Sequence, residues 1–204
     1  MAIPVSGGWE SRVLLAASKD ISDKTYYFVY KHSNYSDNHP DIKYPKMLLE
    51  QLGLTLNIFE CSKNISEEHH NNLGKILSFP RFSNFNYLFS AVNKHIPNYL
   101  VLNGNVSEIC RMQWDEIKIK DEYRIAFLEN YPYQQFALKH YKKWLEDNNP
   151  TFEKYNYRAS DMLYWEENSA NWVGKANSET RIVADALQPF NSKKLIKTLM
   201  SVDK

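Results

Sequence analysis

The sequence has few cysteines and glycines, no long apolar run and almost no net charge. Among 204 residues it holds 2 cysteines, Cys61 and Cys110, and no Cys-x-x-Cys pair. This excludes a disulfide framework or a zinc site as the basis of the fold, and we expect a reducing, cytoplasmic location. The chain has no apolar run of bilayer length, and its first residues lack the basic and apolar regions of a signal peptide. We therefore expect no membrane partner.

The charge balance argues against a nucleic-acid partner. The chain carries 25 Lys and Arg against 24 Asp and Glu, a formal net charge of +1. A nucleic-acid surface needs a basic excess, which is missing here. Aromatic residues make up 14% of the chain, and without a basic patch they indicate half-buried rings and not a stacking surface. The hydrophobic content of 43% is typical of a globular chain, and 204 residues predict a single domain.

Short strand-like segments alternate with helical ones in the first half of the chain. β-branched and aromatic residues mark the strands, which we predict at residues 1–5, 25–30, 54–59 and 98–102. Helices are predicted over 9–17, from Pro45 to Gly53, from Ser66 and over 82–95. The order predicts an open parallel α/β sheet, Rossmann-like, with right-handed crossovers. This core ends near residue 115, and residues 116–204 form a mostly helical C-terminal part.

The N-terminal stretch offers the clearest candidate for a ligand site. Ser6, Gly7 and Gly8 come directly after the first short apolar run and before a helix-forming stretch. Paired glycines allow a sharp turn and a close approach of a ligand to the main chain. The first amides of the next helix have no intrahelical acceptor, and the helix dipole favours an anion there, most often phosphate. Ser6 and Ser11 add hydroxyl groups, and Glu10 stands where a metal ion would bridge it to a phosphate.

This stretch, Ser6 to Ser11, resembles the Ser-Gly-Gly-x-Asp-Ser signature of the PP-loop ATP pyrophosphatases, and most nearly the synthetase domain of asparagine synthetase. Glu10 replaces the usual Asp and is one methylene longer, although it is still a carboxylate for a hard cation. The resemblance implies that residues 1–204 form one ATP pyrophosphatase-like domain with a HUP-type, three-layer core. It also implies ATP and Mg²⁺ as cofactors. Taken alone, the motif also fits an ordinary strand-to-helix turn.

A second stretch, 103–108, resembles the family signature Gly-x-Gly-x-Asp-Glu. Gly104 takes the place of the first glycine, Val106 that of the second, and Glu108 that of the aspartate. The resemblance implies that Glu10 and Glu108 together hold Mg²⁺ on the pyrophosphate. Two carboxylates brought together repel each other unless a cation lies between them. The alternative is that Glu108 only provides a favourable carboxylate at the start of a helix.

A third stretch, 185–191, resembles the family pattern Glu-x-Arg-x-Pro-Phe-Leu-Asp at Pro189 and Phe190. A proline turn between two helices is the alternative for this segment. The resemblance also implies that the adenine ring contacts main-chain groups near Val29 and Tyr30, at the end of the second predicted strand.

The cations nearest to the first two motifs are Arg12 and Arg111. Either could neutralise a phosphate oxygen or a substrate carboxylate, and either could pair with Glu10 or Glu108 for structural reasons. We predict no catalytic role for the two cysteines, and we interpret both as small buried hydrophobic residues.

The resemblance implies an ATP-dependent ligase that forms AMP and pyrophosphate. It would adenylate a carboxylate or amide of a small-molecule substrate for attack by an amine or ammonia. The chain begins at the ATP loop, so no glutaminase domain is expected in front of it, and a separate ammonia or amine donor is required. Two alternatives stay open: a nucleoside- or tRNA-modifying PP-loop enzyme, and a non-catalytic adenine-nucleotide-binding module, which the two Asp-to-Glu replacements would suit.

Overall fold

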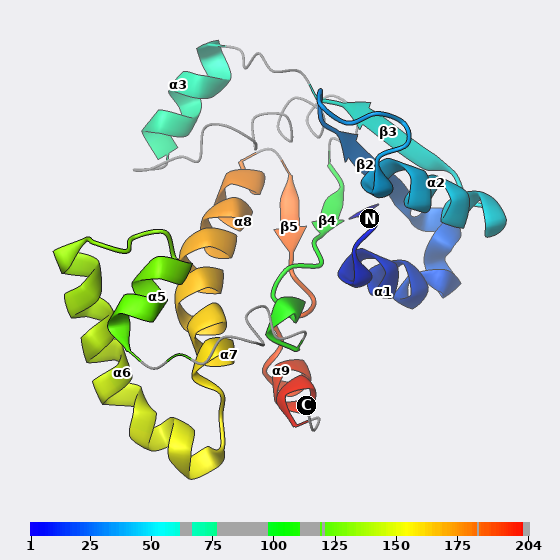
Figure 1. Cartoon of the computed structure of the whole chain (residues 1–204). Coiled ribbons are helices and arrows are strands. Elements are labelled where there is room, and N and C mark those ends of the chain that lie inside the picture. Colours follow the sequence, from blue (N-terminus) through cyan, green and yellow to red (C-terminus); the bar gives the residue numbers. More distant parts are fainter. Residues whose placement is uncertain (62–66, 77–97, 111–118, 120, 183, 202–204) are drawn as a thin grey trace. The chain divides into compact units, whose positions relative to one another are not determined.

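An open, all-parallel sheet carries the N-terminal motif (Figure 1). The computed structural model describes residues 1–61, 67–76, 98–110, 119, 121–182 and 184–201. Within them the strand order is β3-β2-β1-β4-β5. The strands are β1 (Ala2–Pro4), β2 (Tyr26–Lys31), β3 (Leu56–Glu60), β4 (Leu100–Leu102) and β5 (Asp185–Leu187). The predicted α/β class with a Rossmann-like parallel sheet is confirmed.

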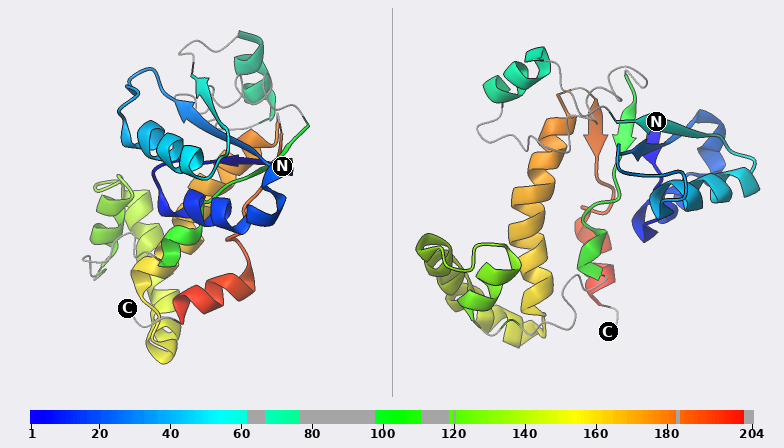
Figure 2. Two further views of the ribbon diagram at one scale, coloured as in Figure 1. Left: turned by 90° about the vertical axis from the view of Figure 1, so that its right-hand side faces the viewer. Right: turned by 45° about the horizontal axis from the view of Figure 1, so that its top comes forward.

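The chain divides into two compact units. The first contains the sheet and comprises Met1–Ser107 and Asn171–Ser192, and the second comprises Glu108–Ala170 and Lys193–Lys204. The helices of the first unit are α1 (Trp9–Ala17), the 3₁₀ segment η1 (Lys19–Lys24), α2 (Pro40–Gln51), α3 (Glu67–Ile76) and α8 (Gly174–Thr180). Helix α1 packs beside β1, α2 against β2 and β3, and α8 beside β5 (Figure 2). The chain passes between the units at three points, which lie in η2 (Ser107–Cys110), in η3 (Tyr164–Val173, a π-helix) and between Ser192 and Lys193.

The strands β1 and β2 carry buried apolar side chains on both faces, as is typical of the centre of a parallel sheet. Ala2, Ile3 and Phe28 are fully buried, and the rings of Phe28 and Phe59 stack with their centroids 5.4 Å apart. Pro4 has no N–H to donate to a neighbouring strand. It is tolerated because it is the last residue of β1, which pairs with β4 at Ala2. The central strand is therefore short, and the residues after Pro4 are left to form a turn.

Two sequence expectations about this unit are wrong. Helix α2 begins at Pro40 and not near Pro45, because Nδ1 of His39 accepts a hydrogen bond from the Asp41 amide (3.2 Å) and caps it. Histidine is not a usual capping residue, so the start was missed. The alternative of a proline turn between two helices is wrong in one respect: the turn at Pro189 follows a strand, Asp185–Leu187, whose main chain pairs with β4. The predicted helix over 82–95 lies outside the described residues.

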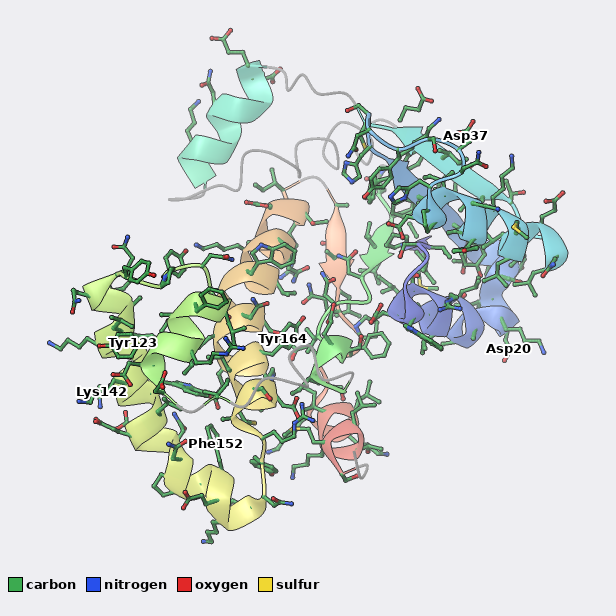
Figure 3. The ribbon with its side chains drawn as sticks, in the orientation of Figure 1. Asp20, Asp37, Tyr123, Lys142, Phe152 and Tyr164 are labelled. Atoms are coloured by element: carbon green, nitrogen blue, oxygen red, sulfur yellow. The ribbon has the colours of Figure 1, made fainter. Side chains whose placement is uncertain are left out.

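The second unit has a helical core of its own. Its helices are α5 (Glu122–Leu128), α6 (Gln135–Tyr155), α7 (Ala159–Leu163) and α9 (Lys193–Met200). The longest helix of this unit is α6, which is amphipathic and carries the buried Phe152 near its C-terminal end (Figure 3). The indole nitrogen of Trp144 donates to Glu166 Oε2 at 2.9 Å, which gives the polar end of a buried ring a partner. In the part of the chain that the structure describes, no helix has the length and apolar character of a membrane span.

Candidate functional site

The first two predicted loops follow neighbouring strands at the point where the strand order reverses. The strands run β3-β2-β1 on one side of this point and β4-β5 on the other. Ser6–Ser11 follows β1, and residues 103–107 follow β4. In open α/β sheets ligands bind beyond the carboxyl ends of the strands at such a switch point. The third predicted stretch begins with β5, the neighbour of β4, and the Asn103 amide donates to the Leu187 carbonyl at 2.9 Å.

Two serines hold the turn after β1 in shape. The Ser6 amide donates to Ser11 Oγ at 3.0 Å, and the Gly8 amide donates to Ser6 Oγ at 3.2 Å. Ser11 Oγ lies 3.2 Å from the carbonyl oxygen of Ser6, to which it donates. Gly8 is the N-cap of α1 and has no side chain to accept from the first helical amides. The positive end of the helix is therefore not capped by its own N-cap residue, which favours an anion from outside.

The paired glycines leave little space for a side chain. A Cβ on Gly7 would lie 3.1 Å from Asp41 Oδ1 and 3.3 Å from the Pro40 carbonyl oxygen, and a Cβ on Gly8 would lie 3.0 Å from Glu10 Oε2. The Gly7 amide donates to Asp41 Oδ1 at 3.0 Å. The Gly7 amide, in the turn where the sequence predicts a phosphate, therefore already donates to the Asp41 carboxylate. Sequence reasoning missed Asp41, although it also follows a strand whose carboxyl end lies at this edge.

Gly104 joins the loop after β4 to the loop after β1. A Cβ on Gly104 would lie 2.6 Å from the Cβ of Glu10 and 3.4 Å from the Ser11 amide nitrogen. Only glycine permits this approach of the two segments. The Gly104 carbonyl in turn accepts from Ser107 Oγ at 3.1 Å. The contact fixes the start of α1, and with it Glu10, against the second motif.

Val106 adopts a backbone conformation that belongs to glycine. Its φ is +83°, and its side chain is buried. The other non-glycine residues with positive φ in the described part of the chain are all asparagines, which tolerate it better. The family pattern that this loop resembles has glycine at the position of Val106. The loop therefore keeps a glycine-type turn at the cost of backbone strain, a feature that clusters at functional sites.

A glycine at this position should relieve the strain. Val106→Ala keeps a Cβ in the left-handed region, where it costs about 1–2 kcal/mol, whereas Val106→Gly removes it. We expect Val106→Gly to be more stable than Val106→Ala by about 1 kcal/mol in urea unfolding. The control pair is Val101→Gly and Val101→Ala in strand β4, where glycine should instead be less stable by about 0.5–1 kcal/mol. The same order in both pairs would contradict the strain.

The end of β2 presents main-chain groups that β1 does not reach. The β1–β2 ladder ends with the Val5 amide donating to the Phe28 carbonyl at 2.8 Å. Successive residues of a strand direct their main-chain groups to opposite sides, so Phe28 and Tyr30 face β1, while Val29 and Lys31 face β3. Since β1 has ended, no strand in the described part of the chain pairs with the N–H and C=O of Tyr30 on that side. The main-chain groups of Val29 face β3. Of the two residues predicted to contact the adenine, Tyr30 is therefore the one whose main chain is available.

The hydroxyl group of Tyr30 and the thiol of Cys61 are poorly suited to a catalytic role. The Tyr30 ring packs edge-on against Phe28, and burial raises the pKa of its hydroxyl well above the ordinary value. Burial also raises the pKa of the Cys61 thiol to about 11. At neutral pH Cys61 is therefore a protonated thiol and a poor nucleophile, which argues against sulfur transfer through this residue.

Of the predicted residues Arg12, Arg111 and Glu108, the structure places only Arg12 at the turn. Arg12 is exposed, its Nε donates to the Gly8 carbonyl at 3.2 Å, and its guanidinium lies over the Trp9 ring at 4.6 Å from the centroid. Arg12 thus lies at the turn. Arg111 falls outside the described residues. Glu108 is the first residue of the second unit, so its pairing with Glu10 stays a prediction from the sequence.

No complete metal cage is present among the described residues, because no three His, Cys, Asp or Glu side chains are arranged to hold an ion. A divalent cation at Glu10 would therefore need oxygens of a ligand as well, which is how Mg²⁺ commonly binds on phosphates.

Comparison with family models, with curated proteins and with solved structures finds no match to this chain. The fold and the turn define an open parallel α/β protein with a glycine turn at the switch point of its sheet.

Proposed function

We propose that this protein binds Mg²⁺-ATP at the carboxyl ends of β1 and β4 and cleaves it between the α- and β-phosphates. The observation that carries the proposal is the contact between Gly104 and Glu10, which joins the loops after the two strands at the switch point. The proposed cleavage between the α- and β-phosphates is based on the resemblance of both loops to the PP-loop signatures. The result is an AMP- and pyrophosphate-forming ligase of the asparagine synthetase type.

The turn after β1 holds the phosphates. The first amides of α1 and the hydroxyl group of Ser6 provide donors, and the helix dipole favours the negative charge. Ser11 supports the turn, because its hydroxyl donates to the Ser6 carbonyl. Glu10 fits a magnesium site, since Mg²⁺ takes one or two carboxylates together with phosphate oxygens. Magnesium would neutralise charge on the departing pyrophosphate. Glu108 is the proposed second carboxylate.

The main chain of Tyr30 binds the adenine. Adenine presents an acceptor nitrogen next to its 6-amino donor, and one N–H with one C=O on the same side of a strand complements this pair. Tyr30 offers both groups on the side of β2 that faces β1, beyond the end of β1. The phosphate turn follows β1, the strand beside β2. Base and phosphates therefore bind at the ends of adjacent strands.

The substrate reacts at the α-phosphorus. A carboxylate or amide oxygen attacks it, the bond to the bridging oxygen of the β-phosphate breaks, and pyrophosphate leaves with the electron pair. Ammonia or an amine then attacks the activated carbon and displaces AMP. Arg12 lies at the turn and Arg111 follows the second motif, so both are proposed to neutralise phosphate or substrate oxygens.

The test is a binding and product assay on the full chain. Isothermal titration calorimetry with ATP, with and without Mg²⁺, measures binding, and an assay of AMP and pyrophosphate with a panel of carboxylates, amides, amines and ammonia measures turnover. We expect Mg²⁺-dependent binding and equal amounts of AMP and pyrophosphate. Binding without any product would identify a non-catalytic nucleotide-binding module. Failure to bind ATP, or release of ADP and phosphate, would refute the proposal.

A further inference from the structure

We propose that Asp41 is a built-in competitor of the nucleotide, whose carboxylate holds the Gly7 amide until a phosphate group displaces it. This inference rests on the proposed function, since it assigns a regulatory contact to the same turn. It concerns the segment His32–Asp41, called here the latch loop, which connects β2 to the first turn of α2.

The contact is direct and leaves little space. The Gly7 amide lies 3.0 Å from Asp41 Oδ1, and a Cβ on Gly7 would touch both that oxygen and the Pro40 carbonyl oxygen. Asp41 is 34 residues away in sequence, so the contact is tertiary and not part of the turn itself. A phosphate oxygen at the Gly7 amide and the Asp41 carboxylate would be two anionic acceptors for one N–H. Their like charges would also repel each other, so the two states exclude one another.

The latch loop is organised to present this carboxylate. The Asp41 amide donates to His39 Nδ1 at 3.2 Å, and Nδ1 lies 3.9 Å from Asp41 Oδ2. The His39 ring stacks on Tyr35 with centroids 3.6 Å apart and planes 9° apart, and Tyr35 in turn meets the edge of His32 at 5.0 Å. Three rings and one cap therefore set the position of Asp41. A loop built this way has a defined closed state in which Asp41 contacts the turn at Gly7.

A closed state lowers the apparent affinity for the nucleotide by the fraction of molecules that are open. A latch that is closed for about nine-tenths of the time weakens binding roughly tenfold. The same linkage requires that phosphate binding releases the latch loop. The nucleotide site and the latch loop thus form one two-state element, with Asp41 as the contact that both compete for.

The test compares Asp41→Asn with Asp37→Asn in the full chain. Asp37 lies on the same loop (Figure 3), is exposed and pairs with Lys31 at 2.7 Å, so the control removes the same charge away from Gly7. The probe is magnesium pyrophosphate, measured by calorimetry. We expect about tenfold tighter binding for Asp41→Asn and no more than a small change for Asp37→Asn. In the wild-type chain, hydrogen exchange in residues 32–41 should become faster when pyrophosphate is added, a readout that needs no variant.

The outcomes separate the latch from the proposed function. If the wild-type chain binds pyrophosphate and Asp41→Asn binds equally or more weakly, the latch is refuted and the nucleotide site stands. If only Asp41→Asn binds, the latch is supported in its strongest form. If neither binds, both proposals fail. Slower exchange in residues 32–41 on addition of pyrophosphate would also refute the latch, because it would show that the ligand closes the loop.

Discussion

Gly104→Ala is expected to weaken the binding of Mg²⁺-ATP by about 100-fold or more while the chain remains folded. The new Cβ would lie 2.6 Å from the Cβ of Glu10 and 3.3 Å from the Glu10 carbonyl carbon. Neither atom is the far end of a flexible side chain, so the first turn of α1 must move. A displacement of about 1 Å can cost 100-fold at a site that depends on position. Calorimetry with Mg²⁺-ATP measures the loss.

The stability of the Gly104→Ala variant is a second readout. Overpacking of this kind costs about 1–3 kcal/mol, which urea unfolding detects. The matched control is Gly74→Ala in helix α3, where a Cβ meets nothing within 4 Å. There we expect unchanged binding and a gain of up to about 1 kcal/mol in stability, since alanine is the better helix former. Wild-type affinity in Gly104→Ala would contradict the assignment of the two loops to one site.

The second large effect is expected for Glu10→Gln, which keeps the size of the side chain and removes its charge. Magnesium prefers carboxylate oxygens, so the variant should lose the Mg²⁺ dependence of ATP binding. Loss of even an outer-shell partner costs 10–100-fold in metal affinity, so loss of the ligand itself should cost at least about 100-fold. Titration of the ATP complex with Mg²⁺ measures it, and pyrophosphate release should fall in parallel.

Two further variants control this result. Glu10→Asp introduces the residue usual in the family that the motif resembles, and it should bind within about tenfold of the wild type. Glu60→Gln makes the same charge change at the exposed end of β3, where Glu60 lies 3.5 Å from Lys31, and should leave ATP binding unchanged. Unaltered Mg²⁺ dependence in Glu10→Gln would remove Glu10 from the metal site.

The parts of the fold that could be predicted are those with local signals. The strands at 26–31 and 56–60 carry aromatic and β-branched residues, and the turn at Ser6–Gly8 is marked by three successive residues. The fifth strand was missed because Asp185–Leu187 has only one buried side chain, Ala186, and such a short pattern resembles a turn. It is a strand only because β4 supplies its hydrogen bonds.

The parts of the site that the sequence did not reveal depend on register and on distant contacts. That Tyr30 and not Val29 faces the end of β1 follows from the pairing of three strands, which periodicity alone does not determine. The contact of Asp41 with Gly7 joins residues 34 positions apart. The φ of Val106 is set by the loop, since nothing in a valine suggests a left-handed backbone.

The most direct test of the central claim uses the small number of glycines. Selective ¹⁵N labelling of glycine gives six amide signals, one for each glycine of the chain. On saturation with Mg²⁺-ATP, we predict shifts of the signals of Gly7, Gly8 and Gly104, which line the loops after β1 and β4. The remaining three glycines, at positions 53, 74 and 174, should keep their shifts. Unmoved signals of Gly7 and Gly8 in the presence of bound nucleotide would contradict the account.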